Sequence, residues 1–438
     1  MDLSAWGHMN CVAHSRSRSR SRSVAAAVIG NALEWFDFII YALLASAIFK
    51  LFFPAGDPMI SLLIGFGTFG VAFLVRPIGG LVLGVYADRY GRKNALSLAF
   101  IVMAIATGMV AILPTYSMIG LAAPILLITC RILQGFSAGG EFGNATAVLI
   151  EFAPAGRKGL FGSLQMCSQA LAVLIAAGVV FSLSKGLSAE SFESWGWRVP
   201  FLVGALLCPL GLIVRNRMSE SPEFKSAAAG AKSKDAAPLT ILARHHRRQI
   251  LASIAMFAAV TVPNYVNSVY MPSVAVLKHG ISQADAMLGV VMAATLMAIL
   301  VPSFGWLSDK ISRPRIAVAG MFGTLVLNTF LFTLFLERPG VSTYLLLQGG
   351  YVVPYAAFVG ATCTLALERF PVLVRATGSG IGYNLATMVF SGLTPFWLAL
   401  LAASAGAPRA PSVYVAAVMV VGIIGVHMIK NIGVEDGS

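Results

Sequence analysis

Two carboxylates stand inside an apolar stretch near the start of the 438-residue chain. The stretch GNALEWFDFIIY, from Gly30 to Tyr41, carries Glu34 and Asp37 within a run long enough to cross a bilayer. An ionised carboxylate is expensive in lipid, so we expect both side chains to face the interior of a helical bundle. Burial favours the neutral carboxyl and a nearby cation favours the charged form, so such a group can load and release a proton. The alternative is that one of the pair only bonds an arginine or a neighbouring helix.

Buried arginines are the second group of candidates. Arg131, Gln134 and Glu141 lie within about 80° of one another on a helical wheel. Arg131 could release a carboxylate partner when a proton or substrate binds, or it could form a permanent buried ion pair. Arg76 and Arg198 offer the planar fork that matches a carboxylate, so we expect them to bind an organic anion. Helix packing beside neighbouring prolines, and for Arg198 a place at the outer interface, are the competing interpretations.

Polar side chains in other apolar stretches are further candidates for a substrate cavity. Most such residues in membrane bundles bond neighbouring helices instead. The predicted cavity residues are Tyr41, Gln134, Gln165, Ser168, Gln169, Asn264, Tyr265, Asn267, Tyr270, Tyr383 and Asn384. No phosphate-binding lysine loop is present, so we expect neither ATP drive nor a cofactor or metal, with the proton as the coupling ion.

The elements that position these residues are predicted to be membrane helices. Apolar types make up 58% of the chain and charged types only 11%, which is too little charge to cover a soluble surface. Long unbroken apolar runs favour helices over a membrane barrel. The twelve predicted spans are about 24–50, 60–87, 95–113, 118–150, 160–183, 197–215, 249–278, 284–308, 314–335, 341–368, 374–401 and 410–432.

The charge distribution predicts the topology. With the N-terminus in the cytoplasm, 23 of the 31 Lys and Arg fall in cytoplasmic tails and loops and five fall in outer loops. This bias predicts that both termini are cytoplasmic, and it explains the net charge of +13 without a nucleic-acid partner. Residues 1–23, which include SRSRSRSRS, are predicted to be a disordered basic tail, and residues 433–438 a second cytoplasmic tail.

The chain contains an internal repeat. GVYADRYGRK follows the second span and GWLSDKISRPR follows the eighth, with Asp88 and Asp309 at matching places 221 positions apart. Two bundles of six helices are therefore predicted, at residues 24–215 and 249–432, joined by a polar cytoplasmic linker at 216–248. In the second copy Ser312 replaces the expected glycine and Pro314 intrudes, so the sequence favours the first copy as a gate.

These motifs resemble the major facilitator superfamily, and within it the metabolite:proton symporter family. The resemblance covers nearly the whole chain and includes GNALEWFDFIIY, FLVRPIGG, RILQGFSAGGEFG and WGWRVPFLVG. It implies two pseudo-symmetric six-helix bundles, a central site and alternating access. It also implies a gate at the cytoplasmic face, with candidate residues Asp88, Arg89, Arg92, Glu151 and Asp309.

The resemblance implies a function as well. We expect a symporter that imports a small organic anion with protons, with Glu34, Asp37, Arg131 and Glu141 in proton coupling. Some stretches resemble the citrate and tricarballylate branch, so citrate or another tricarboxylate is the first expectation. Other carboxylates such as 2-oxoglutarate, or proline and betaine, are alternatives, followed by a drug:proton antiporter and a non-transporting sensor. A monomer in a bacterial inner membrane is expected.

Overall fold

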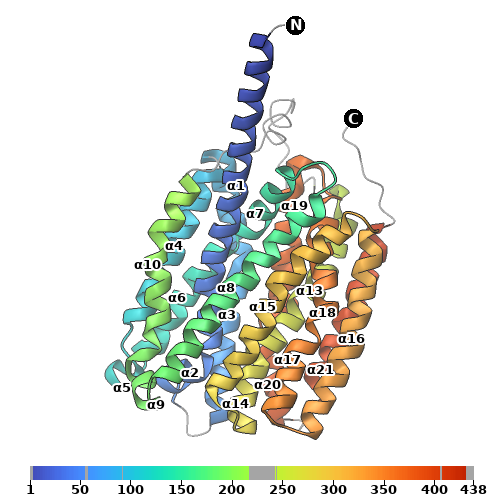
Figure 1. The fold of residues 1–438 in the computed structure, drawn as a ribbon. Coiled ribbons are helices and arrows are strands. Elements are labelled where there is room, and N and C mark those ends of the chain that lie inside the picture. Colours follow the sequence, from blue (N-terminus) through green and yellow to red (C-terminus); the bar gives the residue numbers. More distant parts are fainter. Residues whose placement is uncertain are drawn as a thin grey trace.

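The computed structural model describes residues 3–54, 58–90, 92–216, 242, 244–404 and 407–430, and all regular elements there are helices (Figure 1). In the first half the elements are α1 (Leu3–Leu43), α2 (Ala45–Phe52), α3 (Pro58–Tyr90), α4 (Arg92–Ile112), α5 (Tyr116–Ile119), α6 (Ala122–Ala138), α7 (Glu141–Glu151), α8 (Lys158–Gly186), α9 (Ala189–Ser191), the π-helical turn η1 (Phe192–Gly196) and α10 (Arg198–Asn216). In the second half they are α13 (Arg247–Tyr265), η2 (Val266–Tyr270), α14 (Met271–His279), α15 (Gln283–Ser308), α16 (Arg313–Glu337), α17 (Val341–Gly350), α18 (Val352–Leu367), α19 (Val372–Ala386), η3 (Thr387–Ser391), α20 (Thr394–Ser404) and α21 (Ala410–Lys430).

The helices have the lengths that a bilayer demands. In the described residues, ten spans are long and apolar enough to cross a membrane, and a pair bent by 41° at residues 189–213 makes an eleventh. A shorter apolar helix, Ser97–Ile112, brings the set to the twelve that the sequence predicts. Helices satisfy their own backbone polar groups, which is why they are suited to lipid.

The bundle has two halves that meet along several helix pairs. α8 packs against α15, α7 against α19, and α3 against α20. Figure 1 shows the first half in blue to green beside the second half in yellow to red, with α1 beginning and α21 ending at the same end of the bundle. We call this the terminal end; it is the end that the charge bias predicts to be cytoplasmic. Most of the predicted linker, and residues 433–438, lie outside the described residues.

The predicted disordered tail is a difference between sequence and structure. α1 begins at Leu3, so the helix continues through the Arg-Ser repeat and extends beyond the bundle (Figure 1). The physical reason is that the repeat contains neither glycine nor proline, and arginine is a good helix former.

Two spans of the second half change their helical hydrogen bonding near their middle. η2 follows Pro263, and η3 joins α19 to α20. The two breaks lie on adjacent spans, which are linked by a hydrogen bond between the Thr261 and Ser391 hydroxyls. π-helical turns of this kind are frequent at functional sites, because they redirect side chains within a span.

Candidate transport site

A cavity of about 50 Å³ lies between the two halves. Its walls come from α1, α8, α13, η2, α15, α18 and α19. The lining residues are Trp35, Met166, Gln169, Ala170, Val173, Val260, Thr261, Asn264, Tyr265, Ser268, Ala293, Ala294, Met297, Tyr351, Tyr355, Val359 and Tyr383. The lining is therefore aromatic and uncharged, and most of it comes from the second half.

Side chains of the two halves meet on both sides of this cavity. Towards the terminal end, the rings of Phe142 and Tyr383 are stacked with centroids 3.6 Å apart. Towards the opposite end, the rings of Phe66 and Tyr270 lie 6.3 Å apart. Contacts between the two halves therefore lie on both sides of the cavity, which is itself only partly enclosed.

Arg76 stands directly behind the aromatic lining. Its guanidinium carbon lies 5.7 Å from the centroid of the Trp35 ring and 5.5 Å from that of Tyr383, and the residue is only 2% exposed. One long hydrogen bond of 3.4 Å reaches the Ala138 carbonyl, while Nε and Nη1 have no hydrogen-bond partner. A guanidinium buried in this way has donors free for a planar anion.

Other polar atoms without partners gather at the same place. The Tyr265 and Tyr383 hydroxyls lie close to Arg76, and Gln169 Nε2 lies on the lining beside Tyr383, but their geometry falls short of a regular hydrogen bond. All of these atoms can donate a hydrogen bond. Because buried donors are normally satisfied, a group that only accepts, such as a carboxylate, is the complement of this cluster.

Arg131 lies one layer further from the cavity, on α6. Its guanidinium carbon is 4.3 Å from the centroid of the Tyr41 ring and 4.7 Å from that of Phe38. Nη1 donates to Gln134 Oε1 at 2.7 Å, whereas Nε and Nη2 have no partner. Tyr41 and Gln134, which the sequence predicted as cavity residues, therefore contact Arg131 and do not line the cavity.

Close approach of α3 and α6 places the two arginines. A Cβ atom at Gly139 would overlap the backbone oxygen of Arg76, and one at Gly135 would overlap that of Ala72. These two glycines thus let the helices touch backbone to backbone.

Both predicted proton-coupling carboxylates of α1 are buried. Glu34 and Asp37 are each 3% exposed. Asp37 Oδ1 has no hydrogen-bond partner and faces Gly204, where a Cβ atom would overlap it. Glu141 is likewise buried, at the start of α7. No ion pair joins Asp37 to Arg131 among the described residues, so the two are not held as a permanent pair.

Several other predicted substrate residues bond neighbouring helices instead. Gln165 Nε2 donates to Asn31 Oδ1 at 2.8 Å and so ties α8 to α1. Asn384 Nδ2 donates to the Gly139 carbonyl at 2.7 Å, across the two halves. The Tyr270 hydroxyl reaches the Leu398 carbonyl at 3.5 Å. Polar residues in membrane bundles often serve in this way, and their spacing along the sequence does not reveal it.

Asn267 belongs to a separate network of amides in the second half. Its Nδ2 lies 3.3 Å from Asn328 Oδ1, and its backbone carbonyl accepts from Gln348 Nε2 at 2.8 Å. Gln348 Nε2 also lies 3.2 Å from the Tyr344 hydroxyl. This network is buried, and Tyr351, which lies beside Asn267, is on the cavity lining.

Arg198 is not at the cavity. Its two terminal nitrogens donate to the Ser194 carbonyl at 2.9 Å and the Leu113 carbonyl at 3.0 Å, and its guanidinium lies over the Trp197 ring. The structure thus favours the competing interpretation, a place at the end of the bundle opposite the terminal end. Anion binding by Arg198 stays a prediction: the residue does not line the cavity, and two of its N–H groups bind backbone carbonyls.

The sequence reasoning missed part of the lining. Trp35, Thr261, Ser268, Tyr351 and Tyr355 all face the cavity. A signal was available in YVVPY, where two tyrosines four residues apart within a predicted span must share a helix face. Trp35 lies between Glu34 and Asp37 along the chain, and the prediction for this stretch concerned only the two carboxylates.

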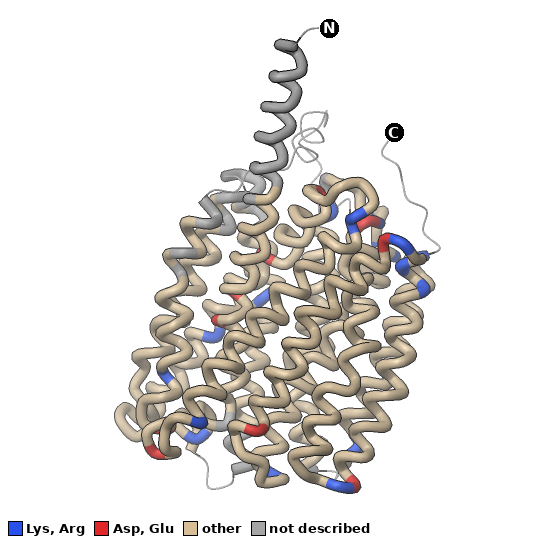
Figure 2. Tube along the Cα trace, viewed as in Figure 1, with Lys and Arg blue, Asp and Glu red and all other residues tan. Residues whose placement is uncertain are grey.

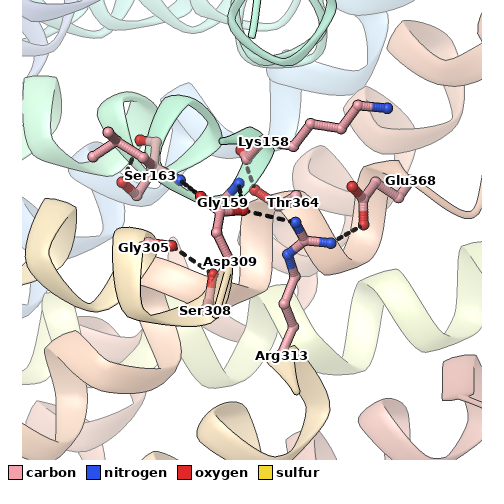
Figure 3. A network of polar contacts seen from close by, with 10 residues as sticks. Lys158, Gly159, Ser163, Gly305, Ser308, Asp309, Arg313, Thr364 and Glu368 are labelled. Atoms are coloured by element: carbon pink, nitrogen blue, oxygen red, sulfur yellow. Dashed lines mark hydrogen bonds and ion pairs between the residues drawn. The ribbon is translucent and has the colours of Figure 1, made fainter. Parts of the chain in front are cut away.

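The side chains of the second loop motif, around Asp309, are the ones that the structure describes (Figure 3). The sequence favoured the first copy as the gate. Asp309 accepts hydrogen bonds from the backbone N–H of Gly159 at 2.6 Å and of Leu160 at 2.9 Å, at the start of α8. A carboxylate at a helix N-terminus is favourable because the first N–H groups have no partner within the helix. The bonds cross from one half to the other, so they hold the halves together at the terminal end.

We call the contacts of Asp309 with the start of α8 the latch, and Arg313 adds to them. Its guanidinium donates to Asp309 Oδ1 at 2.9 Å and to Glu368 Oε2 (Figure 3). Ser312 and Pro314 do not weaken the arrangement, contrary to the sequence argument. They start α16, with Pro314 in its first turn, a position where proline is favoured.

The equivalent gate of the first copy stays a prediction. The side chains of Asp88, Arg89 and Arg92 lie outside the described part of the structure. Glu151 is buried at the end of α7.

Comparison with known proteins agrees with this fold. The model of the "Sugar (and other) transporter" family matches residues 23–239 and 225–432, so the chain belongs to that family and is a major facilitator superfamily transporter. The duplicated match also follows the two halves that the internal repeat predicts.

Several bacterial transporters are similar over most of their length. A citrate-proton symporter of Klebsiella pneumoniae is 33% identical over 395 residues, which is 90% of this chain and 88% of that protein. A proline/betaine transporter of Escherichia coli K12 is 32% identical over 418 residues, 93% of this chain and 83% of that protein. A shikimate transporter of the same organism is 33% identical and covers 85% of each chain.

Solved structures share the fold. The proton:xylose symporter XylE bound to 6-bromo-6-deoxy-D-glucose has a TM-score of 0.77 at 18% identity and covers 95% of this chain and 97% of that one. A partially occluded inward open conformation of XylE from Escherichia coli has a TM-score of 0.74 at 18% identity and covers 96% of this chain and 99% of that one.

Proposed function

We propose that the chain is a proton-coupled symporter that imports a small carboxylate-bearing solute by alternating access. The observation that carries this proposal is a group of unpartnered donors at one cavity: Tyr265, Tyr383 and Gln169 line it, and Arg76 lies behind Tyr383. A carboxylate would satisfy them. The buried carboxyl of Asp37 supports proton coupling, because an ionisable group inside a membrane bundle is a functional site by default.

The lining favours a solute with one carboxylate and an apolar or cationic body. The faces of Trp35, Tyr351 and Tyr355 surround the cavity, and aromatic faces attract quaternary ammonium groups. Proline and betaine have this form, and the similarity to a proline/betaine transporter agrees with it.

Citrate, the first expectation from the sequence, is the second candidate. The observation in its favour is Arg131, whose Nε and Nη2 are also without partners. A tricarboxylate needs more than one cation, and Arg76 and Arg131 would supply two. The similarity to a citrate-proton symporter supports this reading to the same degree.

The remaining parts of the proposal concern the setting of the protein. We place it as a monomer in a bacterial inner membrane, with both termini in the cytoplasm. The charge bias of the loops supports this orientation, and the bacterial origin of the relatives supports the membrane.

The test is uptake of labelled betaine, proline, citrate and shikimate into proteoliposomes containing the purified protein. We expect an acid-outside pH gradient to drive accumulation of one solute, and a protonophore to abolish it. A ranking of unlabelled competitors would then separate the two candidates. Equal uptake with and without the gradient would contradict proton coupling, and no uptake of any carboxylate would contradict the substrate class.

A further inference from the structure

Pro272 leaves one backbone carbonyl of its span without a helical donor. An N–H at this position would bond Ser268 in an α-helix and Asn267 in a π-helix, but proline has no N–H. The structure has the π-helical register here, since the Met271 N–H bonds the Val266 carbonyl. The Asn267 carbonyl is therefore the one that lacks a donor along the helix, and all of η2 is buried.

A side chain of another span supplies the missing donor. Gln348 on α17 donates from Nε2 to the Asn267 carbonyl at 2.8 Å, and the same nitrogen lies 3.2 Å from the Tyr344 hydroxyl. Because that hydroxyl donates to the Ala286 carbonyl at 3.0 Å, it accepts from Gln348. The amide oxygen of Gln348 could bond neither group, so both contacts require the NH₂ group on this side. Asn267, Gln348 and Tyr344 are completely buried, and a buried carbonyl without a donor costs free energy.

The turn that Gln348 holds lies between two parts of the transport site. Tyr265, just before η2, and Ser268, within it, line the cavity. Tyr270, the last residue of η2, contributes the ring that faces Phe66 of the first half. Gln348 itself is not on the lining, so contact with a solute does not explain this buried amide.

We propose that Gln348 is a positioning residue that selects the π-helical register of η2 by supplying the hydrogen bond that Pro272 withholds. In the α-helical register the carbonyl without a donor would be that of Ser268, and the bond from Gln348 to Asn267 would no longer compensate for it. A change of register by one residue turns the side chains beyond it by about 100°. The register therefore decides whether the residues before and after η2 face the cavity and the first half at the same time. The consequence for solute binding rests on the proposed function, whereas the register itself does not.

Hydrogen–deuterium exchange of the purified protein tests the register without requiring transport. Gln348→Met keeps the length of the side chain and removes both N–H groups, so one carbonyl is unsatisfied in either register. We expect the backbone amides of residues 266–271 to exchange about tenfold faster, while exchange in α21 stays at the wild-type rate. Tyr344→Phe, which removes only the hydroxyl beside Gln348, should act in the same direction by a smaller factor.

Restoring the helical donor distinguishes this role from general packing. Pro272→Ala supplies an N–H that can bond the Asn267 carbonyl, so the double variant with Gln348→Met should exchange within about twofold of Pro272→Ala alone. Thr362→Val is the matched control: this buried hydroxyl bonds the Phe358 carbonyl of its own helix, so exchange in η2 should not change. Unchanged exchange in both Gln348→Met and Tyr344→Phe would overturn the inference, and so would faster exchange that Pro272→Ala does not reverse.

Uptake of labelled betaine connects the register with the site. Gln348→Met should raise KM by about fivefold with kcat within about twofold and a wild-type pH dependence, since it moves part of the lining and leaves the buried carboxyls unchanged. An unchanged KM together with faster exchange would overturn the connection with solute binding. Wild-type protein that takes up no betaine contradicts the first candidate solute of the proposed function, and the exchange rates still decide the register.

Discussion

The two halves share a fold but bury different kinds of polar side chain. The first half buries Glu34, Asp37, Arg76, Arg131 and Glu141 within its helices, whereas the second half buries the amides and hydroxyls around Asn267. Figure 2 shows the same contrast: charged residues at mid-height are gathered in the first half, and the middle of the second half is free of them in the described residues.

The contrast indicates that the two halves of a duplicated fold can have different functions. Burying a charged side chain in a membrane bundle costs free energy, so such residues are usually functional. Amides and tyrosines can form hydrogen bonds with one another at little cost. We therefore assign proton coupling to the first half and shape recognition of the solute to the second. Four substitutions test this assignment.

Neutralising Asp37 should have the largest effect on transport. We expect Asp37→Asn to abolish gradient-driven accumulation, since the variant has no carboxyl to load at this position. Exchange of labelled for unlabelled solute across the membrane should continue, because it needs no net proton movement. Comparing accumulation with exchange in proteoliposomes checks this. Accumulation at the wild-type level would mean that another group carries the proton.

Removing Arg76 should have the next largest effect. Hydrogen bonds from a charged group contribute roughly 1.5–3 kcal/mol each, so losing two donors in Arg76→Ala should lower kcat/KM by about 100-fold or more. Arg198 provides the matched control from the same half, because its donors bind backbone carbonyls. Arg198→Lys should stay within about twofold of wild type. Similar losses in both variants would argue against a substrate role specific to Arg76.

Weakening the latch tests the contact between the halves. Asp309→Asn keeps the shape of the side chain but removes the charge that α8 and Arg313 bind. We expect the terminal end to open more often, and alkylation of a cysteine introduced at buried Ser163 to accelerate by about tenfold, in a protein whose native cysteines are replaced. The corresponding Asp285→Asn, at the exposed start of α15, should leave the rate unchanged. Equal rates in wild type and Asp309→Asn would show that the latch does not hold this end closed.

The smallest effect is expected in the second half. Tyr351→Phe removes one hydroxyl from the lining, and a single neutral hydrogen bond contributes about 1 kcal/mol, so KM should change by about fivefold. The pH dependence of uptake should be that of the wild-type protein. A shifted pH profile in Tyr351→Phe would mean that proton coupling extends into the second half.

Much of the architecture could be predicted from the sequence. The twelve spans, the repeat and the burial of Glu34 and Asp37 follow from apolar run length and from the cost of charge in lipid. The cavity could be predicted only in part: Gln169 and Tyr383 were correctly expected to line it, and so were Asn264 and Tyr265. Gln165 and Asn384 were not distinguishable from them, because a polar side chain on a buried face looks the same whether its partner is another helix or a solute.

The sequence by itself therefore determined which residues must avoid lipid, since that requirement acts on each helix separately. Only the tertiary structure decided which of them meet. Arg76 Nε and Nη1 have no partner beside the cavity, whereas two nitrogens of Arg198 bind backbone carbonyls, because α3 packs against α6 while α10 begins beside the Leu113 carbonyl. Thr107, an ordinary threonine in its own span, accepts a hydrogen bond from Gln134 because α4 packs against α6. Such pairings depend on distances between helices, which periodicity within one helix does not contain.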